Sequence, residues 1–463
     1  MPRLITRVVL LAALLLGLGA LPSTADMIIT LKDGSVIRVP VRAEDVQSLT
    51  FEDGTSEPDA AAGEQTPDPL VAEEASEPKH AAAPGRQALV PPVPPATRSL
   101  RAAPIQVGPD RKYKVPSQAA RVARDGDVIE IDAGEYVGDV AHWRQNNLTI
   151  RGVGGRAHID AQGNSSGGKA IWVISGDNVT VENVELSGCT VPDLNGAGIR
   201  LEGTNFTLRN SYIHDNQMGL LSSGNRESRI LIENSEFARN VVNYEATGSL
   251  GHNIYIGRVR SFTLRGSYVH QASIGHNVKT RAAENYIIAN RIMDGTDGNS
   301  SYLIDLAQGG DAYVLGNLLH KSASADNYTM IGYATEGGRE QSDAKLFVVN
   351  NTAVSDMRTG ILLQNHSNSV AVVANNIFLG GQSLSEGPSR LAANLTGGDA
   401  GLVDAKGFDY RLAPGSPAID AGDESIAADG VSLIPDVQYV EPLQLEPRPR
   451  DGAVDIGAYE AAR

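Results

Sequence analysis

The sequence predicts an all-β solenoid of about nine to twelve coils. Nine short apolar segments share one pattern and recur every 24 to 34 residues. In each, a run of β-branched or aromatic residues meets one Asn or Gly and then resumes, which is typical of two strands joined by a tight turn. Asn and Gly are the residues that most readily adopt positive φ at such a turn. A period of this size indicates repeats that must stack on one another to bury their apolar faces.

The nine segments place the turns and therefore the coils. They lie at 148–152, 179–186, 206–213, 230–237, 262–269, 286–293, 313–320, 347–354 and 372–379. We expect the Asn side chains to hydrogen-bond from one coil to the next and form a ladder. The fixed turn residues are Gly152, Asn183, Asn210, Asn234, Gly266, Asn290, Asn317, Asn351 and Asn376.

The N-terminus predicts export. Arg3 and Arg7 precede an apolar run at 8–21, and small residues at 23–25 offer a cleavage site. This pattern is typical of a secretory signal peptide covering residues 1–25. The run is short for a membrane span, so we expect a periplasmic or secreted bacterial protein with no span in the mature chain. An uncleaved anchor is the alternative.

Three further regions follow the signal peptide. Residues 26–54 read as a β-hairpin with a possible third strand at 46–51, and residues 55–105 are a linker rich in Pro, Ala and Glu. The solenoid occupies 106–463. An amphipathic pattern at 117–124 predicts a short helix that covers the open edge of the first coil, and the tail closes the other end.

Composition excludes some classes of fold and function. The single cysteine, Cys189, excludes an internal disulfide, and such a cysteine is most often a small buried residue. The formal net charge is −16, which argues against nucleic-acid binding because that function needs a basic face.

Three stretches carry a resemblance to a known family. They are GDVIEIDAGEY at 126–136, the Asn-bearing repeats, and the closing GSPAIDAG at 415–422 with DIGAYE at 455–460. Over about 350 residues the chain resembles the right-handed parallel β-helix (pectate-lyase-like) superfamily. The resemblance implies a right-handed helix of three parallel sheets. Its members include polysaccharide lyases, uronan C5-epimerases, hydrolases, esterases and non-catalytic surface proteins, so it leaves the activity open.

A repeated tripeptide predicts the register of two coils. Gly-His-Asn occurs at 251–253 and again 24 residues later at 275–277. If neither coil contains an offset, His276 lies over His252, Asn277 over Asn253, and Lys279 over Tyr255. Strand alternation then turns Tyr255, Lys279 and Arg281 outward on one face.

The same region predicts a positively charged groove. Residues 246–283 contain no Asp or Glu but hold five Lys or Arg residues. Cations gathered in one groove bind an anion even when the total charge is unfavourable. We therefore expect an acidic polysaccharide as the partner.

Abstraction of the C5 proton of a uronate needs a base and a group that neutralises the carboxylate. Lyases of the resembled family include members with a Lys or Arg base. We assign Lys279 as base, Arg281 as neutraliser, and Tyr255 or His276 as proton donor. The position of Asp305 relative to Lys279 stays open, because the next anchor gap is 27 residues. The expected substrate contacts are His252, Asn253, Asn277, Arg258, Asp305, Arg200 and Glu336.

Several alternatives remain. The preferred activity is β-elimination on a uronic-acid polysaccharide. One alternative is a non-catalytic glycan-binding or cell-envelope scaffold, in which Lys279 and Arg281 form a solvated face and the two Gly-His-Asn tripeptides form a stacking ladder. The other alternative is a C5-epimerase. No metal site or cofactor is expected. Calcium is the minor option, because 294–299 loosely resembles a calcium loop without its closing glutamate.

Overall fold

The computed structural model describes residues 27–30, 36–39, 89–92 and 103–461. The chain divides into two compact units, 1–81 and 82–463. In the first unit, β1 (Met27–Thr30) pairs antiparallel with β2 (Val36–Val39), as in the hairpin expected there. The signal peptide, the third strand at 46–51 and most of the linker lie outside the described residues. None of the described helices is long and apolar enough to cross a membrane.

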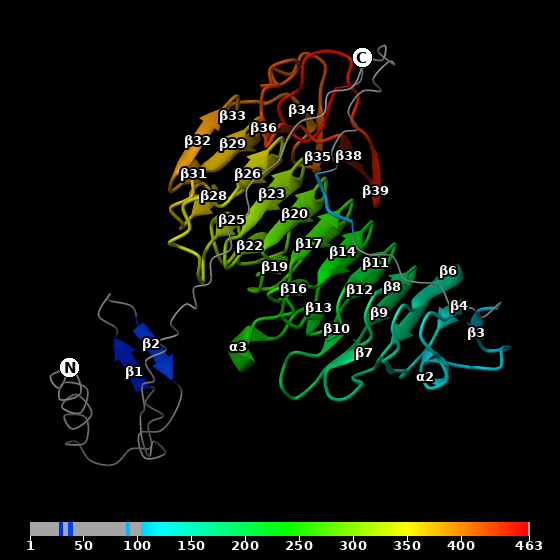
Figure 1. Cartoon of the computed structure of the whole chain (residues 1–463). Coiled ribbons are helices and arrows are strands. Elements are labelled where there is room, and N and C mark those ends of the chain that lie inside the picture. Colours follow the sequence, from blue (N-terminus) through cyan, green and yellow to red (C-terminus); the bar gives the residue numbers. More distant parts are fainter. Residues whose placement is uncertain (1–26, 31–35, 40–88, 93–102, 462–463) are drawn as a thin grey trace, which may run out of the picture. The chain divides into compact units, whose positions relative to one another are not determined.

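The second unit is a stack of parallel coils (Figure 1). One ten-stranded parallel sheet runs along it and carries the candidate site. Its strands, in chain order, are β5 (Ala141–Trp143), β7 (Ala170–Ile174), β10 (Ala197–Leu201), β13 (Met218–Ser222), β16 (Ile254–Ile256), β19 (Val278–Thr280), β22 (Ile304–Leu306), β25 (Thr329–Tyr333), β28 (Ile361–Asn365) and β31 (Ser383–Glu386).

The remaining strands of the coils form a 21-stranded sheet with two rows of parallel strands. The first row contains β3 (Ile105–Val107), β4 (Val128–Glu135), β6 (Thr149–Asp160), β8 (Val179–Glu182), β11 (Phe206–Arg209), β14 (Arg229–Glu233), β17 (Ser261–Arg265), β20 (Glu284–Ile288), β23 (Asp311–Leu315), β26 (Leu346–Val349), β29 (Ala371–Ala374) and β32 (Ser389–Ala392). The second row contains β9 (Val184–Ser187), β12 (Tyr212–His214), β15 (Glu236–Ala238), β18 (Tyr268–His270), β21 (Arg291–Met293), β24 (Leu318–Lys321), β27 (Thr352–Ser355), β30 (Ile377–Leu379) and β33 (Leu395–Thr396). Strands β4 and β6 reach into both rows. Each coil therefore presents three outer faces, as predicted.

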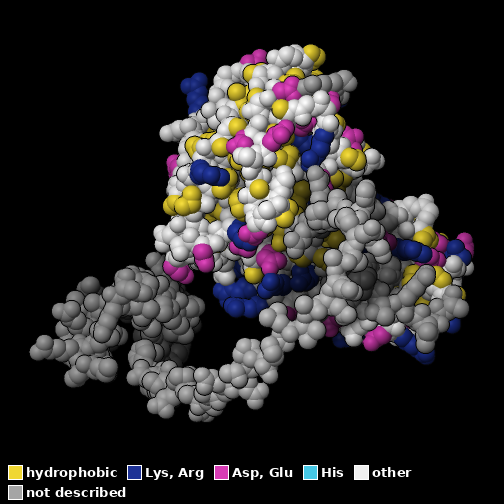
Figure 2. Space-filling view, turned by 45° about the horizontal axis from the view of Figure 1, so that its top comes forward, with side chains coloured by type: hydrophobic (Ala, Val, Ile, Leu, Met, Phe, Trp, Pro, Cys, Tyr) yellow, Lys and Arg dark blue, Asp and Glu magenta, His cyan; other side chains and the backbone are white. Residues whose placement is uncertain are grey.

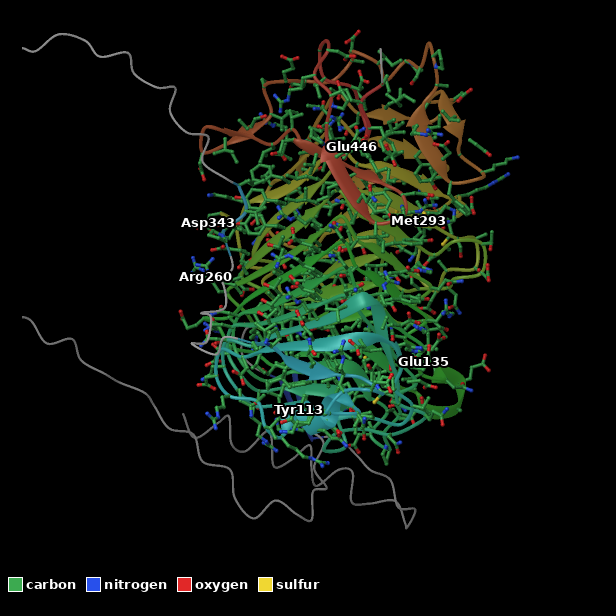
Figure 3. All side chains as sticks on the ribbon, turned by 90° about the vertical axis from the view of Figure 1, so that its right-hand side faces the viewer. Tyr113, Glu135, Arg260, Met293, Asp343 and Glu446 are labelled. Carbon is green, nitrogen blue, oxygen red and sulfur yellow. The ribbon has the colours of Figure 1, made fainter. Side chains whose placement is uncertain are left out.

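The core follows from strand alternation. Inward-facing Ile, Leu and Val residues of successive coils form one continuous apolar cluster along the stack. Figure 3 shows side chains filling the interior and others projecting outward. Burial of this apolar area, at about 25 cal/mol per Å², is the main force that holds the coils together.

The turn between the two rows of the large sheet needs positive φ. The prediction is confirmed at four anchors, which are Asn183 (56°), Asn210 (51°), Asn234 (47°) and Gly266 (60°). It is wrong at the last four, where the positive-φ residue is the one before, namely Ala289 (48°), Gly316 (67°), Asn350 (53°) and Asn375 (54°). Gly152 is also not a positive-φ turn. This position requires glycine because the Cβ atom of any other residue would collide with the Asn183 carbonyl oxygen.

The last four anchors form the predicted ladder. The Asn290 side-chain amide donates to the Asn317 side chain at 3.0 Å, and Asn317 donates to Asn351 at 2.9 Å. Asn351 donates to Asn376 at 2.9 Å in the same way. In earlier coils serine takes this place, and the Ser235 hydroxyl accepts from the Ser211 amide.

The first coil and one side of the stack are covered. The short helix α2 (Pro116–Ala120) packs on the first coil, ending earlier than predicted. The C-terminal segment packs on the side of the later coils of the stack (Figure 1). It contains β34 (Leu402–Asp404), β35 (Asp409–Leu412), β36 (Ala427–Ala428), β37 (Val431–Ser432), β38 (Val437–Val440) and β39 (Gln444–Pro447). Helix α3 (Tyr244–Thr247) lies in the loop before β16.

Candidate functional site

The predicted register of the two Gly-His-Asn coils is confirmed. On the ten-stranded sheet Tyr255 of β16 pairs with Lys279 of β19, and Lys279 pairs with Asp305 of β22. The core-facing residues expected on either side, Ile254 and Val278, are fully buried. Three chemically active side chains therefore lie side by side on one outer face.

An ion-pair network joins these residues. Lys279 Nζ lies 2.8 Å from Asp305 Oδ2 and 2.6 Å from Glu336 Oε1. Glu336 reaches in from the loop after β25, and its Oε2 atom also accepts from Arg281 Nη2 at 2.6 Å. The Arg281 guanidinium stacks over the Tyr255 ring at 4.9 Å and donates to the Tyr255 hydroxyl. Lys279 and Arg281 are thus held together through one shared carboxylate.

The network determines which groups carry charge. Burial opposes the charged form of Lys279, but Asp305 and Glu336 outweigh it and raise the pKa of Lys279. Burial likewise opposes the charged form of Glu336, but Lys279 and Arg281 lower the pKa of this carboxyl. The ammonium of Lys279 is therefore protonated at neutral pH in the free protein, which does not favour it as a ready base.

A groove opens above part of this network. Its volume is about 550 Å³, and it is lined by Ser222, Gly224, Tyr255, Gly257, Arg258, Arg281, Gln308 and Glu336. Lys279 and Asp305 lie beneath, because their side chains are only 8% and 1% exposed. A ligand in the groove would meet Tyr255, Arg281 and Glu336 directly.

Two predicted arginines also lie on this face. Arg258 is exposed in the groove wall, and its Nε donates to Gln308 at 2.7 Å. Arg200 shares the row of Tyr255, two coils away, because Arg200 pairs with Leu221 and Leu221 with Tyr255. No salt bridge of Arg200 occurs among the described residues.

The two histidines form a buried stack. The rings of His252 and His276 lie 4.9 Å apart, and the His276 backbone N–H donates to His252 Nδ1 at 3.0 Å. Burial, together with the positive charge of Lys279 and Arg281, lowers the pKa of His252 to about 3. Burial also lowers the pKa of His276 well below its ordinary value. Both rings are neutral at pH 7, and neither lines the groove.

Asn253 and Asn277 are placed away from any ligand. Both are fully buried in a second ladder, where Asn240 donates to Asn253 at 2.9 Å and Asn253 to Asn277 at 2.8 Å. Their location indicates a structural role for the asparagine of the repeated tripeptide.

The expected surplus of positive charge is contradicted by the ion pairs. Arg260 pairs with Glu284 and Arg265 with Glu233, both on the other sheet. Only Arg258 of the five basic residues in the window lacks a salt bridge among the described residues. On the face shown in Figure 2, basic and acidic side chains likewise lie next to one another. The acids come from neighbouring coils, which a window along the chain does not count.

The loop considered for calcium is organised around an internal cation. Asp294 is buried, and its carboxylate accepts a hydrogen bond from the Ser322 backbone N–H. Lys321 Nζ lies 3.9 Å from Asp294 Oδ2. Burial lowers the pKa of Lys321 to about 8. The loop thus has its own contacts for Asp294, and calcium stays the minor option.

Comparisons with known proteins agree with this fold. The family described as a right handed beta helix region matches residues 136–243. The structure is similar to pectate lyase Pel9A, with a TM-score of 0.54 and 14% identity over 78% of this chain and 97% of that chain. It is also similar to an alginate lyase from Paenibacillus sp. str. FPU-7, with a TM-score of 0.41 and 16% identity over 61% of this chain and 96% of that chain. A search of the curated proteins finds no match. The chain is a right-handed parallel β-helix protein, and similarity at this identity shows the fold alone.

Proposed function

We propose that this protein binds a uronic-acid polysaccharide in the groove above Tyr255 and Arg281 and cleaves it by β-elimination. The observation that carries the proposal is the phenol of Tyr255 and the guanidinium of Arg281 together in the groove lining, with the buried Lys279 ammonium bound to Glu336 of the same lining. We also propose that the protein acts after export, since its N-terminal sequence is typical of a signal peptide.

The proposed step uses three side chains. Arg281 binds the uronate carboxylate, taking it in place of Glu336, and stabilises the negative charge that develops when the C5 proton leaves. Lys279 then loses one of its two acidic partners, which favours its neutral form. The ammonium gives a proton to solvent, and the neutral amine takes the C5 proton. The C4–O4 bond breaks, the C4=C5 double bond forms, and the leaving oxygen takes a proton from Tyr255.

Tyr255 suits the donor role better than His276. The Tyr255 hydroxyl oxygen accepts from Arg281, so its own proton is free to be given to a ligand in the groove. Burial lowers the pKa of His276 well below its ordinary value, so its ring carries no acidic imidazolium proton at pH 7.

A second candidate, a glycan-binding protein without catalysis, is favoured by one observation. Two carboxylates raise the pKa of Lys279 and hold it protonated. If they keep it so in the complex, the groove binds uronate and no proton is removed.

The test is an absorbance assay for unsaturated uronate with alginate, pectate and glycosaminoglycans. A lyase gives a rising signal with at least one polymer, and Lys279→Ala abolishes it. Arg260→Gln, which lies just before β17 and outside the groove lining, should retain activity. Binding without any rise would support the second candidate, while deuterium incorporation at C5 without a rise would indicate the epimerase.

A further inference from the structure

A second cluster of chemically active side chains lies on the 21-stranded sheet, outside the groove. Strands β6, β9 and β12 are neighbours, and His158 pairs with Glu185. His214 pairs with Ser187, two residues beyond Glu185, so the three side chains share one outer face. Their ligand atoms lie within 4.8 Å of one another. Among the residues that the structure describes, this is the one group of three such side chains so close together.

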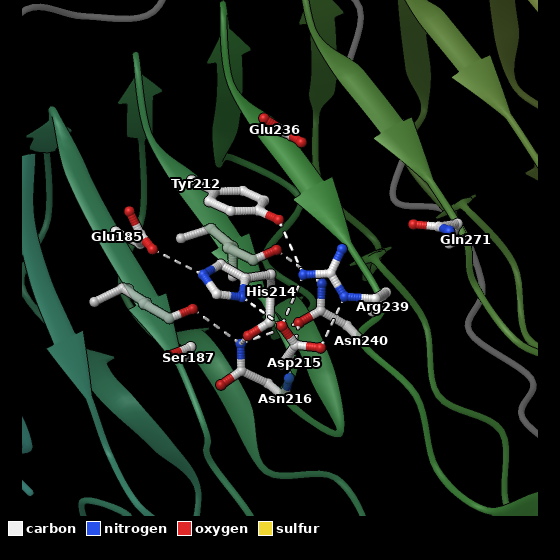
Figure 4. Close-up of polar contacts among 12 residues, drawn as sticks. Glu185, Ser187, Tyr212, His214, Asp215, Asn216, Glu236, Arg239, Asn240 and Gln271 are labelled. Atoms are coloured by element: carbon white, nitrogen blue, oxygen red, sulfur yellow. Dashed lines mark hydrogen bonds and ion pairs between the residues drawn. The ribbon is translucent and has the colours of Figure 1, made fainter. Parts of the chain in front are cut away.

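The outer nitrogen of each ring is held by a carboxylate. His158 Nδ1 lies 2.7 Å from Glu135 Oε2, and His214 Nδ1 lies 2.6 Å from Asp215 Oδ2. Arg239 fixes Asp215 through contacts of 3.0 and 2.8 Å (Figure 4). Because a carboxylate accepts, each Nδ1 carries a hydrogen, which leaves Nε2 as the ring nitrogen with which each histidine can bind a ligand. Metal-binding histidines show this same outer contact, which fixes the ring and its tautomer.

The Nε2 atoms of both rings face the same carboxylate, that of Glu185. His214 Nε2 lies 3.1 Å from Glu185 Oε1, and His158 Nε2 lies 3.8 Å from the same oxygen. The Ser187 hydroxyl lies 2.8 Å from His158 Nε2 and donates a hydrogen bond to it. Three electron-pair donors therefore converge on one point, an arrangement that a cation stabilises. Figure 4 shows Glu185 and His214 turned toward each other.

We propose that His158, Glu185 and His214 bind a divalent first-row transition metal ion, of which Zn²⁺ is the type. Imidazole and carboxylate together suit zinc, whereas calcium and magnesium take oxygen ligands. Ligands about 2.1 Å from a tetrahedral zinc ion are roughly 3.4 Å apart, close to the 3.1 and 3.8 Å separations. Three protein ligands leave a fourth position for water. The ion would link three successive coils.

The chain contains a natural control for this site. Two coils beyond His214, His270 Nε2 lies 3.1 Å from Glu236 Oε1, and His270 stacks on Tyr268 as His214 stacks on Tyr212. The third ligand is missing there, because among the described residues no further His, Cys, Asp or Glu completes a group of three at this pair. One His–Glu pair alone would not hold the ion.

The experiment uses untagged full-length protein titrated with Co²⁺, followed by visible absorption, and with Zn²⁺, followed by calorimetry. We expect one ion per chain, with a spectrum typical of four-coordinate cobalt and a rise in the thermal midpoint with Zn²⁺. His214→Ala and the nearly isosteric Glu185→Gln should each weaken binding more than about 100-fold, since even outer contacts contribute 10- to 100-fold. His270→Ala should bind as the wild type does.

Three results would overturn the proposal. They are the absence of saturable binding of either ion to the folded wild type, binding that Glu185→Gln leaves unchanged, and binding that His270→Ala weakens as much as His214→Ala does. Circular dichroism confirms that each variant is folded, and if His214→Ala does not fold, Glu185→Gln decides.

Discussion

At the scale of single residues, partners from neighbouring coils decide the chemistry. The sequence places Lys279 beside Tyr255 correctly, because the two coils differ by no inserted residue. It could not show that Asp305 and Glu336 both contact Lys279, because that depends on where two longer loops fold. The His158–Glu185–His214 cluster was missed for a related reason. Its members are about one coil apart and are joined by no local motif.

Glu336 occupies the cations that we assign to the substrate carboxylate. Glu336→Gln should therefore strengthen binding of a uronate oligosaccharide by up to about fivefold, because an ion pair this exposed contributes on the order of 1 kcal/mol. Calorimetry measures the affinity. Glu340→Gln is the matched control, since it removes the same charge from the same exposed loop. Equal effects of the two variants would mean that Glu336 does not compete with the ligand.

His252 makes stability depend on pH. Its pKa is about 3 in the folded chain, against an ordinary value of 6.5. As the pH falls from about 6.5 toward 3, the unfolded chain takes up a proton that the folded chain does not. Stability then falls by about 1.4 kcal/mol per pH unit for this residue. The stabilising contribution is complete above pH 6.5.

Thermal midpoints at pH 7 and pH 5 test this linkage. The drop on acidification should be smaller in His252→Gln than in the wild type, while His366→Gln, outside the groove lining, should behave as the wild type. His276 contributes in the same direction, so part of the drop remains. An unchanged drop in His252→Gln would show that the ring is protonated in the folded protein.

At the scale of the elements, the period of the sequence predicts the strands well and the turn residue less well. Asn fits both the positive-φ turn and the ladder position one residue later, so the pattern alone does not separate them. In the coils with Asn290 and Asn317, Ala289 and Gly316 take the turn and leave the asparagine to the ladder. Apolar periodicity predicts which residues face inward, whereas it carries no information on this one-residue choice.

The ladder should be a large local source of stability. Asn317 is fully buried, donates to the Ile287 carbonyl and to Asn351, and accepts from the Asn290 amide. Asn317→Ala leaves these partners without a hydrogen bond, and each buried group left this way lowers the free energy of unfolding by about 1–3 kcal/mol. Amide hydrogen exchange should accelerate in the coils on either side. Asn394→Ala, at the partly buried end of the ladder, should have the smaller effect. Similar protection in both variants would contradict this account.

At the scale of the whole molecule, a solenoid must cover its open edges and its apolar sides. The C-terminal segment covers one side of the later coils, where the Gly457 amide donates to the Asn375 carbonyl at 2.8 Å and the Asn350 side chain donates to the Asp455 backbone carbonyl. The sequence predicted a closing tail from its motifs. It did not predict that Leu89 and Val90, within the assigned linker, also pack on the large sheet.

Arg448 fixes the C-terminal segment. It is 4% exposed, contacts Glu460 at 2.6 Å and donates to the Gly457 and Ala458 carbonyls. Arg448→Met leaves a buried carboxylate without its partner, which costs about 3–5 kcal/mol. A clear fall in the thermal midpoint is expected, while the exposed Arg450→Met should have little effect. Equal midpoints would show that the segment is held by its apolar contacts alone.

The central claim is that an acidic polysaccharide binds on the outer face of the ten-stranded sheet. The most direct measurement is a crystal structure of the protein with a uronate tetrasaccharide, with Lys279→Ala used to prevent turnover. We predict sugar density in the groove above Tyr255, with a carboxylate within hydrogen-bond distance of Arg281 or Arg258. An oligosaccharide bound on another face, or an empty groove at a saturating concentration, would contradict it.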